Sequence, residues 1–195
     1  MTQSTRNPVP PETCKAVLEL AKEREALRFG DFVLASGQHS SYYFDGRLLS
    51  LDSKGAGLLG DVVVDIARRY NVQAVGGPTI AADPIIGAAL FAASKRNIPL
   101  RGFLVRGEVK DHGTGKMVEG PYGKGTNVMV LDDTCSTGGS LFHAIKAMEA
   151  DGCKVAVVMC VLDRHQGGSE KLRQSGYPFV SLLEADPQGN IRVTP

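Results

Sequence analysis

The sequence predicts an α/β fold in which a central parallel sheet is flanked by helices. Three observations support this prediction: short apolar strands recur without polar alternation, a segment with helical spacing follows almost every one, and 43% of the 195 residues are hydrophobic. Strands that are apolar on both faces indicate a parallel sheet with helices on both sides. Ligands of such sheets bind at the carboxyl ends of the strands, so a functional site is expected there.

The first part of the chain is predicted to lie beside this core as a helix and a small sheet. Thr13 is the expected N-cap of the helix, because apolar residues recur at helical spacing from Cys14 to Ala21. Two β-prone runs, 32–34 and 42–44, are separated by a polar loop with a turn glycine, which is typical of short strands. We expect this small sheet to stand at the edge of the core.

From residue 52 onward the chain alternates between helices and strands. The expected elements are a helix that carries Leu58 to Ile66, a strand at 73–75, a helix at 83–95, strands at 102–105 and 128–131, a helix at 140–150, a strand at 155–162, a helix at 169–174 and a strand at 179–183. We expect one domain over residues 1–195, with residues 1–50 forming the first helix and a small hood and residues 51–185 forming the α/β core. Residues 106–127 interrupt the alternation with six glycines and three lysines, and so long a loop predicts a functional lid or disorder.

Composition excludes several classes of function. The formal net charge of +1 gives no global field that would draw the protein onto nucleic acid or an anionic membrane. The start is polar and proline-rich, and no stretch reaches the roughly 18 apolar residues of a membrane span. The cysteines form neither a C-x-x-C pair nor a zinc-spaced cluster, which indicates a reduced cytoplasmic protein; they are Cys14, Cys135, Cys153 and Cys160.

The strongest local signal is the stretch 128–140, VMVLDDTCSTGGS. An apolar strand leads through Asp132 and Asp133 into a turn of small residues, 134–140, which opens a helix near Ser140. Small residues let backbone N–H groups approach a phosphate closely, and the helix adds its positive dipole end. We call residues 134–140 the phosphate turn.

The two acids narrow the choice of ligand. Adjacent carboxylates would repel a phosphate unless they face hydroxyl groups or a divalent cation, and a phosphorylated sugar supplies both. An isolated acid pair could equally end a strand and cap a turn, but the thirteen-residue context favours the sugar phosphate. The chain contains neither G-x-x-x-x-G-K-[ST] nor a G-x-G-x-x-G after a strand, which disfavours a kinase or a dinucleotide enzyme.

Residues 128–140 resemble the signature of the type I phosphoribosyltransferases, which bind phosphoribosyl pyrophosphate (PRPP). The resemblance implies that family's fold, with Asp132 and Asp133 beneath the ribose hydroxyls and as catalytic residues. It also implies that the phosphate turn wraps the 5-phosphate of PRPP through Thr134, Cys135, Ser136, Thr137, Gly138, Gly139 and Ser140.

Three further stretches resemble the orotate phosphoribosyltransferases within that group: residues 106–116, with the pattern R-x-E-x-K-x-H-G, residues 36–47, and residues 76–84. The resemblance implies that orotate and PRPP are converted to orotidine 5'-monophosphate and pyrophosphate in pyrimidine biosynthesis. It implies Mg²⁺ that is carried by PRPP, with no firm protein ligand. It further implies a homodimer in which the loop 106–121, which we call the lid, reaches the partner's site.

The residues of the lid and of the predicted base site suit this chemistry. Arg106, Lys110 and His112 could meet the negative charge that develops on the leaving pyrophosphate once a glycine-hinged lid closes. Orotate is a flat anion, so its site should offer stacking and a cation. For this role the sequence offers Tyr43 and Phe44, which could also be plain core residues, and the resemblance adds Arg164 and Ser136.

The sequence also departs from the family pattern. Gly107 stands where members often carry a second basic residue, and Ala35 and Ala81 stand where some carry a PRPP-binding lysine. Weaker pyrophosphate binding, or substitution by Lys116, is expected. Two alternatives stay open: a phosphoribosyltransferase for a purine or uracil, and a PRPP-sensing regulator without catalytic activity. The absence of a basic stripe for nucleic acid speaks against the regulator.

Overall fold

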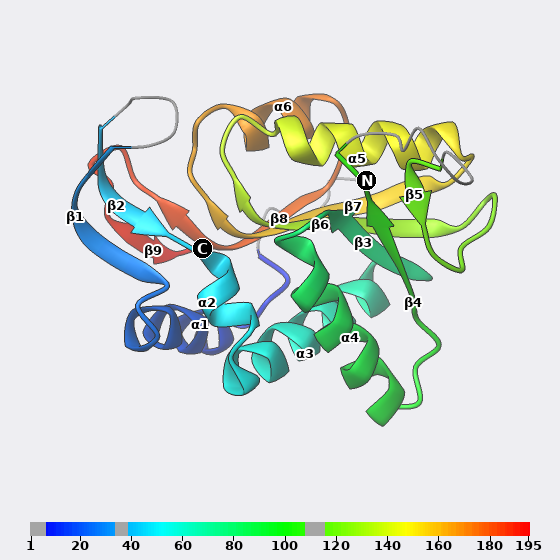
Figure 1. Cartoon of the computed structure of the whole chain (residues 1–195), viewed down its shortest axis with the longest axis horizontal. Helices are drawn as coiled ribbons and strands as arrows, with labels where there is room; N and C mark the ends of the chain where they lie inside the picture. The colour runs from blue at the N-terminus through cyan, green and yellow to red at the C-terminus, as the bar shows by residue number, and fades with distance from the viewer. Residues whose placement is uncertain (1–6, 34–38, 108–115) are drawn as a thin grey trace.

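The structure is a computed structural model, and it describes residues 7–33, 39–107 and 116–195. Its centre is a seven-stranded sheet with the strand order β5-β4-β3-β6-β7-β8-β9 (Figure 1). The strands are β3 (Ala74–Pro78), β4 (Arg101–Val105), β5 (Val118–Glu119), β6 (Asn127–Cys135), β7 (Lys154–Asp163), β8 (Phe179–Ala185) and β9 (Ile191–Val193). The five central strands pair in parallel, which confirms the predicted sheet, whereas the two edge strands, β5 and β9, pair antiparallel.

Helices cover both faces of the sheet. They are α1 (Pro11–Glu23), α2 (Gly46–Ser50), α3 (Ser53–Arg69), α4 (Ala82–Lys95), α5 (Gly139–Ala150) and α6 (Gly168–Gln174). In Figure 1, α1, α3 and α4 lie on one side of the sheet and α5 and α6 on the other. Side chains of β6 alternate between the two resulting cores, because Met129 and Leu131 join one cluster and Val128 and Val130 join the other. A strand buried on both faces has to be continuously apolar, as the sequence predicted.

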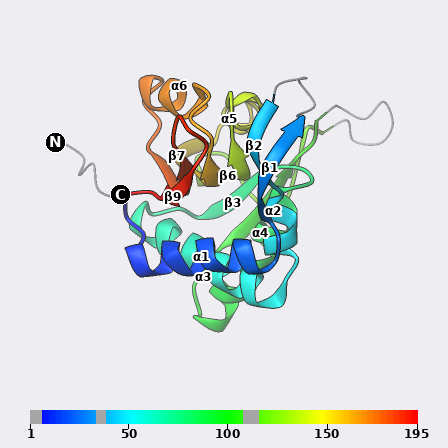
Figure 2. The same ribbon diagram turned by 90° about the vertical axis from the view of Figure 1, so that its left-hand side faces the viewer.

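The N-terminal small sheet is also present. β1 (Leu27–Val33) and β2 (His39–Phe44) pair antiparallel, with Leu27 opposite Phe44. The short helix α2 follows directly, and Figure 2 shows the hairpin standing beside the carboxyl end of the main sheet. We call β1, β2 and α2 the hood.

Several element boundaries differ from the prediction. The first helix begins at Pro11 instead of after Thr13, because proline fits the first helical turn and its missing N–H would have no partner there. β6 continues through both acids to Cys135, and α5 begins at Gly139. The elements that sequence reasoning missed, α2, β5 and β9, have only two to five residues, which is too short for a periodic signal.

Two other expectations concern cysteine chemistry and membranes. All four cysteines are free and buried, and burial raises the pKa of each thiol, to about 12 for Cys135. Such thiols are poor nucleophiles. Within the described ranges, no helix combines the length and the apolar character that crossing a membrane would require.

Candidate active site

The phosphate turn lies where β6 leaves the sheet and α5 begins. Gly138 has a left-handed backbone (φ 82°) and is the N-cap of α5, a conformation that favours glycine. Within the described chain no side chain caps this helix end, so the first N–H groups of α5 stay available to an anion. The backbone geometry therefore provides the uncapped helix start that an anion site at this turn would need.

Gly168, the first residue of α6, packs against the phosphate turn. Its N–H donates to the Ser136 carbonyl at 2.9 Å. A Cβ added at Gly168 would lie 2.6 Å from both the Gly138 nitrogen and the Ser136 oxygen. Backbone atoms cannot yield as a flexible side chain can, so the start of α6 and the phosphate turn can approach this closely only through glycine.

Asp132 and Asp133 lie at the end of β6 with their carboxyl groups desolvated. Asp132 accepts hydrogen bonds from the Ser140 hydroxyl and from the Asp133 N–H, both at 2.9 Å. Burial, and then the charge of Asp133, raises the pKa of Asp132, and burial likewise raises the pKa of Asp133. Two desolvated carboxyls with this tendency favour a ligand that brings hydroxyl donors or a cation.

The hood contacts this acid pair directly. A Cβ at Gly46 would lie 2.5 Å from the Asp133 Cβ and 2.8 Å from its Oδ2. Asp45 caps α2 by accepting from the Arg47 N–H and also holds the Arg47 guanidinium at 2.8 Å. Gly46 and Arg47 were not among the predicted site residues, although the segment that contains them was singled out.

Arg164 links the hood to the phosphate turn. Its backbone N–H donates to the Cys135 carbonyl at 2.8 Å, and its guanidinium donates to the Phe44 carbonyl at 3.5 Å. The guanidinium carbon lies 5.7 Å from the centre of the Tyr42 ring, and the buried Nε has no partner among the described residues. A buried donor without an acceptor is costly unless a ligand supplies one.

The two aromatic residues predicted to stack on the base point in opposite directions. Phe44 is 4% exposed and belongs to the hydrophobic core, so the core alternative describes its side chain. Tyr43 faces the other way and packs on Phe32, with ring centres 5.7 Å apart, and on Arg28 at 5.3 Å. Tyr42, which sequence reasoning passed over, shares a face with Phe44 because side chains alternate along a strand.

The root of the lid is anchored on both sides. The Arg106 N–H donates to the Met117 carbonyl at 3.0 Å, and the Arg106 guanidinium pairs with Glu119 on β5 at 3.1 Å. His143 on α5 contacts the Arg106 carbonyl at 2.9 Å. The structure therefore brings the two ends of the lid together. Of the predicted residues nearby, Lys116 is exposed, and those outside the described ranges are Lys110, His112 and Ala35.

Two of the departures from the family pattern, Gly107 and Ala81, lie within the described residues. A Cβ at Gly107 would meet no described atom within 4 Å. Ala81 precedes α4 and provides no capping side chain. Neither residue supplies a charge to the site.

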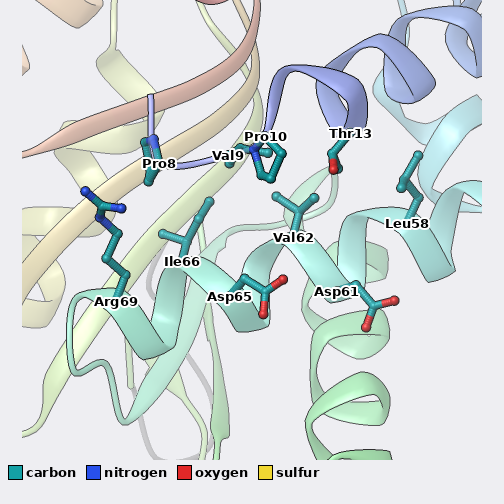
Figure 3. A pocket seen from close by; sticks show the side chains of 10 residues that line it. All are labelled: Pro8, Val9, Pro10, Thr13, Leu58, Asp61, Val62, Asp65, Ile66 and Arg69. Carbon is teal, nitrogen blue, oxygen red and sulfur yellow. The ribbon is translucent and has the colours of Figure 1, made fainter. Parts of the chain in front are cut away.

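The structure also has a cavity that these residues do not line. It has a volume of about 280 Å³ and lies between the start of α1 and α3 (Figure 3). Apolar side chains such as Val62 and Ile66 face it, together with Asp61, Asp65 and Arg69. It contains none of the predicted site residues. Among the described residues, no group of three or more His, Cys, Asp or Glu side chains is arranged to hold a metal ion.

Comparison with known proteins identifies the class of this fold and site. The family model of the phosphoribosyl transferase domain matches residues 74–180, which include the phosphate turn and Arg164. The chain is 42% identical over 166 residues to orotate phosphoribosyltransferase of Rhodopirellula baltica, covering 82% of this chain and 86% of that protein. It is 38% identical to the orotate phosphoribosyltransferase of Streptomyces avermitilis, covering 89% and 96%.

Solved structures agree with the sequence relatives. The Mycobacterium tuberculosis orotate phosphoribosyltransferase in complex with PRPP superimposes with a TM-score of 0.72 at 30% identity, covering 90% of this chain and 96% of that one. The chain is thus a type I phosphoribosyltransferase by fold and domain, and within that class it belongs to the orotate phosphoribosyltransferase family.

Proposed function

We propose that this enzyme transfers the phosphoribosyl group of PRPP to orotate, forming orotidine 5'-monophosphate and pyrophosphate for UMP synthesis. One observation supports the proposal above all: the guanidinium of Arg164, whose buried Nε has no partner among the described atoms, lies against the hood, while the backbone N–H of the same residue is bonded to the phosphate turn. An orotate carboxylate would supply the missing acceptor. A site for a sugar phosphate and a site for a carboxylated base then adjoin each other.

The PRPP side of the site is assigned to β6 and the phosphate turn. The N–H groups of the turn and of the first residues of α5 bind the 5-phosphate, with the hydroxyls of Thr134, Ser136, Thr137 and Ser140 around it. Asp132 and Asp133 accept hydrogen bonds from the ribose hydroxyls. The raised pKa of each acid supports this assignment, because such donors relieve the cost of ionising buried carboxyls.

The carboxyl pair also fits a cation brought by the substrate. Mg²⁺ bound to PRPP would offset the charge of the pyrophosphate. Both acids already accept hydrogen bonds from the protein, which suits contact with a ligand-borne ion better than a dedicated protein site. We therefore assign Mg²⁺ to the substrate, facing Asp132 and Asp133.

On the base side, Arg164 binds the carboxylate and the Ser136 hydroxyl contacts the ring. We assign the stacking contact to Tyr43, which stands on the hood with its ring already held by Phe32 and Arg28. Phe44 contributes through its backbone, since its side chain is buried.

Catalysis by this chain consists of positioning and charge balance. The transition state resembles an oxocarbenium ion between two anions. Lid residues Arg106, Lys110 and His112 meet the departing pyrophosphate, and closure excludes water. The Arg106 guanidinium is paired with Glu119 in the described structure. In this step it must leave Glu119 and bind the pyrophosphate. Replacing Lys110 with alanine should lower turnover by about 10²-fold.

We infer a homodimer in which the lid of one subunit completes the site of the other. A surface suited to pairing lies on α3 and α4, where Phe91 is 66% exposed beside Ala88, Ala92 and Gly57 around a hollow of about 350 Å³. Exposed aromatic surface next to small residues is typical of interfaces. Mixing Lys110→Ala protein with an inactive phosphate-turn variant should restore part of the activity. No recovery would contradict the shared site.

A phosphoribosyltransferase for a neutral base shares the fold and the phosphate turn, but it would leave Arg164 without a carboxylate. A regulator without activity would need no cationic lid.

The buried free cysteines support a cytoplasmic location for the enzyme, where thiols stay reduced.

The proposal is tested with a panel of bases, PRPP and Mg²⁺. Consumption of orotate is followed by its ultraviolet absorbance, and adenine, hypoxanthine and uracil serve as comparison bases. We expect orotate to have a kcat/KM about 10- to 100-fold above any other base, since a missing charged partner costs about 1.5–3 kcal/mol. Turnover of uracil equal to that of orotate would contradict the assignment of Arg164.

A further inference from the structure

A cluster of charged side chains surrounds His165, the residue that follows Arg164, and the mechanism above does not use it. Its centre is His165, which has a left-handed backbone (φ 49°) and whose N–H donates to the Asp163 carboxylate at 2.9 Å. Histidine adopts this conformation more readily than most residues. The backbone at the Arg164 to His165 junction is therefore held by Asp163, whose side chain is buried.

Both nitrogens of the His165 ring face carboxylates. Nδ1 lies 3.2 Å from Glu170 on α6, and Nε2 lies 3.3 Å from Glu184 on β8. A neutral imidazole has one N–H, so one of these contacts would set a lone pair against a carboxylate oxygen. Only the imidazolium, with two N–H groups, donates to both partners.

The other charges around the ring are consistent with this state. Glu184 also accepts from Arg192 on β9 at 2.8 Å, and Arg192, Asp186 and the ring line a cavity of about 390 Å³ that also reaches Arg164. Burial alone lowers the pKa of His165. The hydrogen bond to Glu170, the charge of Asp163 and the contact with Glu184 outweigh burial, so the pKa lies above its ordinary value.

We propose that protonated His165 is a positioning residue that ties β7 to α6 and β8 and so holds Arg164 in place for the carboxylate of the base. The inference rests on the proposed function for the identity of that base. When His165 loses its proton, one of the two ties is lost, the backbone beside Arg164 loosens, and orotate binds more weakly.

PRPP should be little affected by this change. The phosphate turn is also held by the hydrogen bond from the Gly168 N–H to the Ser136 carbonyl. This bond involves neither the Arg164 backbone nor the His165 ring. A KM effect confined to orotate separates this role from a general loss of structure.

The test compares the native enzyme with His165→Gln, which keeps hydrogen-bonding capacity without a titratable charge, and with His165→Lys, which keeps the positive charge. Glu170→Gln removes the negative charge of one partner and leaves His165 unchanged. Glu149→Gln is the matched control, because Glu149 bonds Tyr177 on the surface, away from the site. For each protein, the KM of orotate, the KM of PRPP and the calorimetric Kd of orotate are measured from about pH 6 to about pH 9.

The ratio of variant to native values at each pH cancels the ionisation of the substrates. For His165→Gln we expect the orotate Kd and KM ratios to be about fivefold at pH 6 and to approach one as the pH rises through the raised pKa, with the PRPP ratio within about twofold. His165→Lys should bind orotate with less pH dependence than the native enzyme. Glu170→Gln should resemble His165→Gln, and Glu149→Gln should resemble the native protein.

A His165→Gln ratio that is the same at every pH, or a PRPP KM that rises as much as that of orotate, would overturn the inference. Equal melting temperatures of the variants would exclude misfolding as the cause of a loss. If the native protein binds orotate but does not convert it, the proposed function fails while the Kd ratios still decide the role of His165. If it binds no orotate at all, both proposals fail.

Discussion

The phosphate turn and the base side of the site are built in different ways. The turn is one run of consecutive residues at the junction of β6 and α5, and the N–H groups that we assign to the phosphate belong to this run and to the first residues of α5. The proposed base side is assembled from segments far apart in the sequence, because Arg164 meets the Phe44 carbonyl across 120 positions. The hood that carries Phe44 meets the acid pair where Gly46 lies against Asp133. PRPP binding should therefore be weakened by substitutions in the turn or in residues that touch it, whereas orotate binding should also be weakened by substitutions in the distant segments that position the base side.

The largest effect is expected at the acid pair. Asp132→Asn keeps the shape and the Ser140 contact but removes the charge, so kcat/KM for PRPP should fall by about 10²-fold. Because burial and the charge of Asp133 raise the pKa of Asp132, the native activity should decline as the pH drops through that raised value. The variant should lose this acidic limb of its profile. Steady-state kinetics against pH measure both effects, with the surface variant Asp151→Asn as control.

The same variant makes an opposite prediction for stability. A carboxyl whose pKa is raised by folding destabilises the native state once the pH exceeds its unfolded value. Without PRPP, Asp132→Asn should therefore unfold at a temperature no lower than the native protein at neutral pH, and we expect a few degrees higher. Calorimetric scans at pH 7 test this, and a clear drop in melting temperature would show that the carboxylate supports the fold instead.

Next in size is the effect of removing the cation on the base side. Arg164→Gln should raise the KM of orotate by about 30-fold and leave that of PRPP within about twofold, since a charge-assisted contact contributes about 2 kcal/mol. The control is Arg173→Gln, which removes a surface guanidinium stacked on Phe179. Equal losses for both substrates would mean that Arg164 supports the phosphate turn more than it binds the base.

A substitution at the junction of the two regions should weaken the binding of both substrates. Gly46→Ala would place a Cβ 2.5 Å from that of Asp133, so the hood must shift away from the acid pair. We expect the KM values of orotate and PRPP to rise together by about tenfold. Gly123→Ala provides the control, since a Cβ there would meet no described atom within 4 Å. A change in only one of the two constants would separate the regions that the structure joins.

The smallest kinetic effect is expected on the hood. Tyr43→Ala should raise the KM of orotate by about fivefold without loss of stability, because the ring lies outside the core. Phe44→Ala should instead lower the free energy of unfolding by about 3–5 kcal/mol, as its side chain is 4% exposed. Denaturant titration and kinetics of the two neighbours together distinguish a binding residue from a core residue.

This contrast also explains what the sequence could predict. The apolar run of β6, the acids and the small residues of the turn are adjacent, so local chemistry identified them together. The central sheet followed from strands that are apolar on both faces. The hood was predicted as a small sheet, but the facing of its side chains depends on register, and one position reverses it. Tyr42 was missed for that reason.

Other parts of the site had no local signal. Nothing near Gly46 in the sequence indicates that Asp133 lies against it, and the pairing of Arg106 with Glu119 depends on a two-residue edge strand. The carboxylates around His165 come from β7, α6 and β8. Such contacts are set by the packing of distant elements.

The most direct test of the account is a calorimetric titration of PRPP with Mg²⁺ and no base, into the native protein and into Gly168→Ala. In the variant, the added methyl group would lie 2.6 Å from backbone atoms of the phosphate turn. We predict saturable binding to the native protein and an affinity about 10²-fold lower in a variant that remains folded. Equal affinity of the two proteins, or no binding of PRPP to the native protein, would contradict the assignment of this turn.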